Sequence, residues 1–197
     1  IGVVCAPSES VVTNMSELSA SQDFKSRELP QWLLAELRSD HAGETGAVWI
    51  YRGILAVTSN VELRKFAEHH LTTEEQHLTL VSKQMPEQQI SIFIPVWKLA
   101  GFLTGAIPAI FGNNSVYATI DAVETFVDRH YQHQIDSLRQ EGSFPALRKL
   151  LEQCQADELC HRDEARAAVK SRNHALRAWC WLVGYGSAVA VKLARWR

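Results

Sequence analysis

The amino-acid sequence predicts an all-α protein: a four-helix bundle with additional helices that lie at a membrane interface. Four stretches place apolar residues on one stripe at alternating steps of three and four residues, the pattern of amphipathic helices. A lone glutamate followed by a Glu-x-x-His motif occurs twice, and two further segments carry almost no charge. At 197 residues with 46% hydrophobic content, the chain is long enough to bury a substantial core as one large domain.

Turn and breaker residues delimit the helices of the bundle. Pro30 suits the first turn of a helix, Ser59-Asn60 supplies a turn with an N-cap, and Met85-Pro86 ends the second helix. Gly142 breaks the chain between the last two helices. These signals predict four helices, at about 30–58, 61–84, 115–140, and from 145 to the break at 171–173. Consecutive helices joined by short turns form two hairpins.

Composition indicates the domain organisation. Residues 1–27 are serine-rich with little periodicity, so we expect a disordered leader there and one functional domain over 28–197. A net charge of −2 gives no indication of a nucleic-acid partner. The sequence has no phosphate-binding glycine-rich loop, nucleophile elbow or dinucleotide-binding fingerprint.

Two apolar segments indicate contact with a membrane. Residues 90–112 carry one charge, Lys98, and are long enough for a transmembrane helix, but their prolines and glycines favour a broken, interfacially inserted pair of helices. A buried crossover segment is the alternative. Residues 174–197 are expected to form a C-terminal interfacial helix, because the uncharged run 178–191 is bracketed by basic residues and accompanied by tryptophans. Here the alternative is a terminal helix that only covers the bundle.

The repeated glutamate and histidine pattern predicts a two-metal carboxylate site, because such sites take one glutamate from each of two helices and a Glu-x-x-His from each of the other two. The candidate ligands are Glu44, Glu74, His77, Glu124, Glu158 and His161. All six fall on the apolar stripes of their helices, where leucine is the usual residue. The pairs Glu44/His77 and Glu124/His161 are centred on the Asn60 and Gly142 turns, so each hairpin brings its lone glutamate level with its own Glu-x-x-His.

Energetics favours bound cations over ordinary salt-bridged residues. Burying unpaired carboxylates costs several kcal/mol each, so four together would rival the whole stability of a domain, about 5–15 kcal/mol. Two divalent metals balance four carboxylates in charge and leave one imidazole for each ion. Oxygen-rich ligands with one histidine per metal suit iron or manganese.

Other residues are candidates for roles beside the metals. His130 is a candidate donor or proton relay, while Asp40 and Asp121 are candidates to orient a ligand histidine. Tyr51 and Tyr131 each lie seven residues after a lone glutamate, which makes the two halves an internal repeat. Glycines 43, 46 and 53 indicate close approach by another backbone or a ligand. His70 is given no role.

The motifs identify the chain as similar to the demethoxyubiquinone hydroxylase family of ubiquinone biosynthesis, which are ferritin-like di-iron monooxygenases. The resemblance runs from about residue 31 to the C-terminus. Its markers are LRSDHAGETGAVWIYRG (37–53), EEQHL (74–78), IPVWKLAGFLTGAIPAIFG (94–112), AVETFVDRHYQHQI (122–135) and ADELCHRDEA (156–165). The resemblance implies that the six candidate ligands hold two irons, that Glu74 and Glu124 bridge both, and that His130 and Tyr131 lie near the centre.

The resemblance also implies an activity: hydroxylation of the ring of a polyprenylated methoxy-methyl-benzoquinol. One atom of O₂ enters the ring, the other leaves as water, and NADH or the reduced quinone supplies electrons. The expected partners are the polyprenyl quinol, a membrane surface, and a ubiquinone-biosynthesis complex or lipid-presenting protein. The expected location is peripheral, on the cytoplasmic face of a bacterial inner membrane or the matrix side of a mitochondrial one. The alternative function is another ferritin-like di-metal protein, such as a tRNA hydroxylase, a peroxidase or an iron-storage bundle.

Overall fold

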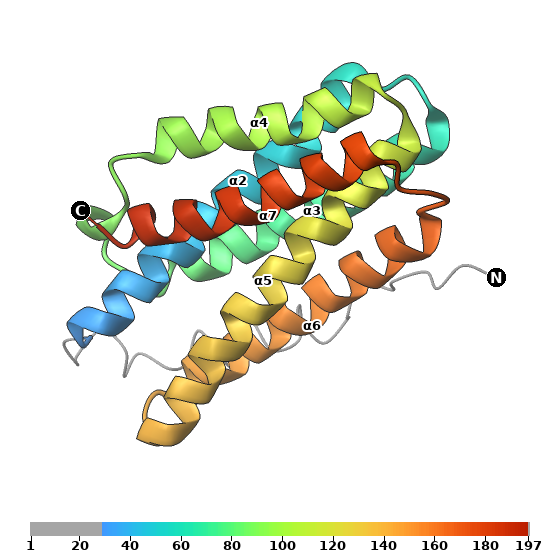
Figure 1. Cartoon of the computed structure of the whole chain (residues 1–197). Helices are drawn as coiled ribbons and strands as arrows, with labels where there is room; N and C mark the ends of the chain where they lie inside the picture. Colours follow the sequence, from blue (N-terminus) through green and yellow to red (C-terminus); the bar gives the residue numbers. More distant parts are fainter. Residues whose placement is uncertain (1–28, 197) are drawn as a thin grey trace.

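The computed structural model describes residues 29–196, and within them the chain is all-α with no strand (Figure 1). The leader predicted over residues 1–27 lies outside the described residues. The elements are α2 (Gln31–Val57), α3 (Val61–Ser82), the short 3₁₀ helix η2 (Glu87–Gln89), α4 (Ile94–Ile110), α5 (Asn113–Glu141), α6 (Pro145–Ala168) and α7 (His174–Ala194). The predicted all-α helical bundle is therefore confirmed, and each predicted bundle helix is found within about two residues of its expected ends.

The two predicted hairpins are α2–α3 and α5–α6, and their turns use the expected residues. Asn60 caps α3, because its side-chain oxygen accepts a hydrogen bond from the backbone N–H of Leu63 at 2.9 Å. Gly142 ends α5 in the left-handed conformation, with φ at 64°. Phe144 takes the same region, with φ at 49°, before Pro145 opens α6.

The hydrophobic core has two parts, one on either side of a polar layer. One cluster joins the C-terminal half of α2 to α3 and the start of α5, around Ile54, Leu63 and Ile120. The other joins the start of α2 to the end of α5 and the start of α6, around Leu37 and Leu151. The helical repeat places these apolar residues in line with the buried glutamates and histidines between them, so the core holds the polar layer in place.

Helix α4 corrects the expectation of a broken helical pair over 90–112. It is one continuous helix: Pro95 lies in the first turn, where no backbone N–H is needed, and Pro108, in the last turn, removes one helical hydrogen bond close to where the helix ends. Helix α4 packs along α2 (Figure 1), and the two backbones touch at glycines. A Cβ added to Gly101 would lie 2.3 Å from the Gly46 carbonyl oxygen. One added to Gly53 would lie 2.2 Å from that of Phe102. The close approach predicted from the α2 glycines is thus found at Gly53, whereas at Gly46 the missing side chain that allows the contact is that of Gly101 on α4.

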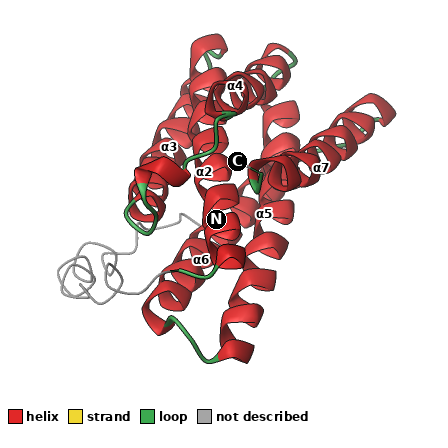
Figure 2. Cartoon of the chain, turned by 90° about the vertical axis from the view of Figure 1, so that its left-hand side faces the viewer, coloured by secondary structure: helices red, strands yellow, loops and turns green. Residues whose placement is uncertain are grey.

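Helix α7 lies over α5 and α2 and buries little of itself (Figures 1 and 2). Asn173 caps it through a 2.8 Å hydrogen bond from the Leu176 N–H. Its contact face includes Cys180, Val183 and Ala194, whereas Trp181 is 68% exposed. Within residues 29–196, no helix is both long enough and apolar enough to cross a membrane.

Candidate metal centre

The structure brings all six predicted ligands into the polar layer between the two hydrophobic clusters. Glu44 comes from α2 and Glu124 from α5, while α3 and α6 supply the Glu-x-x-His pairs. The exposed fractions are 4% for Glu44, 0% for Glu74, 3% for His77, and 2% each for Glu124, Glu158 and His161. Residues that lie far apart in the sequence therefore meet in one buried site.

The six residues form two overlapping groups. Glu44, Glu74, His77 and Glu158 can offer ligand atoms within 4.8 Å of one another, and so can Glu74, Glu124, Glu158 and His161. Glu74 and Glu158 belong to both groups, whereas the resemblance implied Glu74 and Glu124 as the bridging pair. Each shared carboxylate comes from a Glu-x-x-His motif, so the geometry favours the two motif glutamates as the bridging pair.

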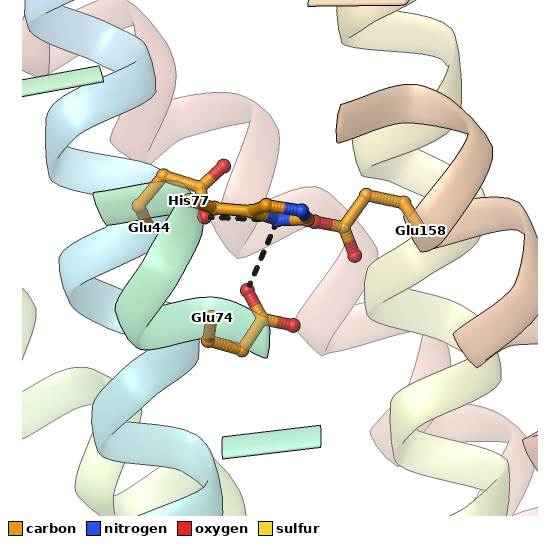
Figure 3. Close-up of side chains that lie close together, drawn as sticks. All are labelled: Glu44, Glu74, His77 and Glu158. Atoms are coloured by element: carbon orange, nitrogen blue, oxygen red, sulfur yellow. Dashed lines mark hydrogen bonds and ion pairs between the residues drawn. The ribbon is translucent and has the colours of Figure 1, made fainter. Parts of the chain in front are cut away.

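The His77 imidazole lies among three of the carboxylates (Figure 3). Its Nδ1 is 3.0 Å from Glu158 Oε1, 3.7 Å from Glu44 Oε2 and 4.0 Å from Glu74 Oε2. The other ring nitrogen, Nε2, is 3.1 Å from Asp157 Oδ2, outside the cluster. Such an imidazole presents one nitrogen to a metal and hydrogen-bonds through the other, the usual arrangement of a metal-bound histidine.

His161 occupies the corresponding place in the second group. Its Nδ1 lies 3.2 Å from Glu74 Oε1 and 3.3 Å from Glu158 Oε2. Burial alone lowers the pKa of His161, but these two carboxylates outweigh it and raise the pKa to about 10. The same contacts, with those of His77, lower the pKa of Glu158 against the effect of burial. Without a metal, the imidazolium ions are the only positive charges that the six residues themselves bring to this cluster.

The donor atoms fit bound cations. Glu44 Oε2, both carboxylate oxygens of Glu74, and Glu158 Oε2 are buried and accept no hydrogen bond of ordinary geometry within the described part of the chain, so their partners there are the ion-pair contacts with His77 and His161. Each unpaired buried polar group costs about 1–3 kcal/mol. Burial also raises the pKa values of Glu44, Glu74 and Glu124, and neighbouring glutamates add to the shift. Metal ions would both pair these oxygens and favour their ionised forms.

Beside the cluster, Tyr131 and His130 take different places. The Tyr131 hydroxyl donates a hydrogen bond directly to Glu44. His130 Nε2 lies 3.0 Å from Asp40 Oδ1, which also accepts a 2.6 Å hydrogen bond from Gln134. Asp40 therefore pairs with His130. It does not contact a ligand histidine, the role for which it was a candidate.

Asp121 also differs from its prediction, because it pairs with Arg166 and Arg172 instead of a ligand histidine. Asp157 contacts His77, although sequence reasoning missed it. The available signal was its position directly before Glu158, but only the packing of α3 on α6 shows which histidine it reaches.

His70, which was given no role, is fully buried beside the second group. Its ring centroid is 4.1 Å from that of His161 in an edge-to-face contact. Its Nε2 lies 3.1 Å from Glu164 Oε2. Burial lowers the pKa of His70 to about 4, so it packs as a neutral ring. Its position one turn before Glu74 on the same stripe was the signal that could have found it.

An apolar cavity of about 370 Å³ opens onto the cluster. It lies between α2, α4, α5 and α7, within the size range of small-molecule sites. Glu44, Glu124 and Glu158 reach its floor, and Gly43 and Gly46 line one wall, where a Cβ would meet nothing within 4 Å. The walls are largely hydrophobic, from Trp97 of α4 to Val191 of α7, so an apolar molecule can reach the carboxylates.

A helical bundle that buries two Glu-x-x-His pairs and two further glutamates around shared carboxylates defines the class of di-metal carboxylate proteins. The model of the family described as "Ubiquinone biosynthesis protein COQ7" matches residues 31–194. The chain therefore belongs to this family, which confirms the family predicted from the motifs.

Named relatives agree with this membership. The 3-demethoxyubiquinol 3-hydroxylase of Rhodospirillum rubrum is 36% identical over 167 residues, 81% of this chain and 74% of that protein. The mitochondrial NADPH-dependent 3-demethoxyubiquinone 3-hydroxylase of Dictyostelium discoideum is 31% identical over 152 residues, 76% of this chain and 70% of that protein. The protein of the same name from Caenorhabditis elegans is 28% identical over 162 residues, 80% and 87% of the two chains.

Proposed function

We propose that this protein is a 3-demethoxyubiquinol 3-hydroxylase, which uses O₂ and a di-iron centre to add a hydroxyl group to the quinol ring. The observation that carries the proposal is the pair of overlapping Glu/His groups at the floor of an apolar cavity, in a chain of this family. The proposed substrate, demethoxyubiquinol, is taken from the names of the bacterial relatives.

In this proposal Glu44 and His77 would hold one iron, Glu124 and His161 would hold the other, and Glu74 and Glu158, which belong to both groups of ligand atoms, would be shared between them. The division follows the two groups of ligand atoms that lie within 4.8 Å. These residues would thereby hold a ferrous pair, which would supply electrons and open coordination positions for O₂ activation. Asp157 fixes the ring orientation of His77 by accepting from Nε2, and Tyr131 holds Glu44 through its hydroxyl.

The cavity accounts for how a lipid quinol meets a buried polar centre. The flat ring enters between α4 and α7 and lies against Gly43 and Gly46, where the missing side chains leave room for it. His130 lies at the wall of the cavity with Asp40 behind it, so it can take or return a proton at a ring hydroxyl. The largely apolar walls keep bulk water away from the reacting ring.

Membrane association and the electron donor are part of the same proposal. Helices α4 and α7, which border the cavity, and the residues next to the ends of α4 expose large apolar side chains, including Leu99 (61%) of α4, Trp181 (68%) of α7, and Ile92 (70%) and Phe111 (75%) beside α4. Such a surface suits peripheral insertion into a lipid interface, from which a polyprenyl quinol enters the cavity. NADH or NADPH is the proposed reductant, in keeping with the NADPH-dependent relatives.

The test is turnover by purified, iron-quantified protein in lipid vesicles, with demethoxyubiquinol, NADPH or NADH, and ¹⁸O₂. The expected product carries one ¹⁸O atom in the new hydroxyl group, as measured by mass spectrometry. Glu44→Ala should abolish this product, whereas Glu75→Ala, a change at an exposed neighbour of Glu74, should leave it intact. A fully iron-loaded protein that forms no labelled product would rule out the proposed reaction and leave iron storage or peroxide consumption.

A further inference from the structure

Tyr51, a residue that has no role in the proposed reaction, occupies the position in the first half of the internal repeat that Tyr131 occupies in the second. Tyr51 follows Glu44 by seven residues, as Tyr131 follows Glu124. Seven residues are close to two helical turns, so each tyrosine lies on the same face of its helix as the glutamate before it. Both tyrosines are buried, with exposed fractions of 0% and 1%.

Helices α2 and α5 run in opposite directions along the centre (Figure 1). The Tyr131 hydroxyl donates to Glu44, which shows that these two residues are level across the helix pair. In an antiparallel pair, seven residues forward along one helix match seven residues back along the other. The register that sets Tyr131 level with Glu44 therefore sets Tyr51 level with Glu124.

The two tyrosines differ in one respect. Tyr131 has its carboxylate partner, whereas the Tyr51 hydroxyl is buried without any hydrogen-bond partner. The ring of Tyr51 cannot easily turn elsewhere, because it stacks on His70 at 5.7 Å and packs against Phe66 at 6.4 Å. A buried hydroxyl without a partner is rare in folded proteins and points to a group that is missing or not yet in place.

We propose that Tyr51 is a positioning residue for the second metal: when the metal pair is bound, its hydroxyl donates a hydrogen bond to Glu124, as Tyr131 does to Glu44. The pKa of Tyr51 supports the assignment, because burial raises it most and Glu124 contributes most among the neighbouring charges, so the hydroxyl remains a donor. Each lone glutamate would then accept a hydrogen bond from a tyrosine of the other hairpin and keep an oxygen available for the metal. The inference rests on the proposed metal centre.

The test compares Tyr51→Phe with Tyr131→Phe, and uses Tyr117→Phe as the matched control at a half-buried tyrosine outside the ligand groups. Metal-free protein is melted, and ferrous ion is titrated anaerobically. Tyr51→Phe should leave the metal-free melting temperature unchanged or higher, because it removes an unpaired buried hydroxyl. It should lower the affinity for one of the two ferrous ions about 10- to 100-fold, which is the usual effect of removing the hydrogen-bond partner of a metal ligand. Tyr131→Phe should lower both the melting temperature and the affinity for the other ion.

The inference is overturned if Tyr51→Phe binds two ferrous ions with unchanged affinities. It is also overturned if this variant lowers the metal-free melting temperature as much as Tyr131→Phe does without a loss of affinity, since Tyr51 would then act only in packing. Failure of the proposed function looks different: the unmutated protein would bind no ion pair, or would bind one and form no hydroxylated product.

Discussion

The contact between α4 and α2 can be tested by a single methyl group at Gly105. A Cβ at this position would lie 1.9 Å from the carbonyl oxygen of Ile50 and 2.8 Å from its carbonyl carbon. Ordinary contact between such atoms begins at about 3.5 Å, so α4 would have to move away by roughly 1.5 Å. Both neighbours are backbone, and no side-chain rotation can relieve the clash.

The expected cost of Gly105→Ala follows from two opposing effects. Overpacking of this kind costs about 1–3 kcal/mol, and the rigid backbone on both sides places Gly105 at the upper end. Against this cost, alanine stabilises a helix by up to about 1 kcal/mol relative to glycine, because of its higher helix propensity. The net loss is about 2 kcal/mol, which lowers the melting temperature of a domain of this size by about 4–8 °C.

Thermal unfolding followed by circular dichroism, with calorimetry as a check, measures this effect. The matched control is Gly184→Ala in α7, where a Cβ would meet nothing within 4 Å, so its melting temperature should stay the same or rise. If Gly105→Ala melts at or above the unmutated protein, or if both variants fall equally, the close packing of α4 on α2 is wrong. Because α4 also lines the cavity, Gly105→Ala should in addition raise the KM for the quinol.

Three further predictions concern pH, metal affinity and membranes. The pKa of His161 is raised to about 10 in the folded, metal-free protein, so its contribution to stability is complete below about pH 6.5 and is lost as the pH rises toward 10. The melting temperature of the metal-free protein should therefore fall over this range, and a constant value in chelator would contradict the expectation. Asp157→Asn should weaken metal binding about 10- to 100-fold in anaerobic titrations, while Asp163→Asn, at an exposed aspartate of the same helix, should have no effect. Replacing Phe111 and Trp181 together by serine should reduce flotation with liposomes without changing the melting temperature, and unchanged flotation would exclude this surface from the membrane contact.

Much of the bundle could be predicted because its rules are local. The alternating apolar spacing sets the helices, and residues such as Asn60 and Gly142 set their ends. Short turns make each hairpin antiparallel, so sequence distance alone brings Glu44 near its Glu-x-x-His. This is why the sequence alone could place all six candidate ligands in one buried layer.

What the sequence could not decide depends on contacts between the two hairpins and on α4. Which carboxylates are shared, which acid faces His77 and where His70 packs are all set by the crossing of helices that are distant in the chain. For the apolar segment 90–112, the prolines and glycines favoured a broken, interfacially inserted pair of helices, whereas the structure has one continuous helix packed on α2. Its glycines are explained by their contact with the α2 backbone, which is distant in the sequence, and this contact places α4 at the wall of the cavity. Local spacing thus placed the six candidate ligands in one layer, whereas the long-range packing of rigid helices decided which two carboxylates belong to both groups and where the cavity opens.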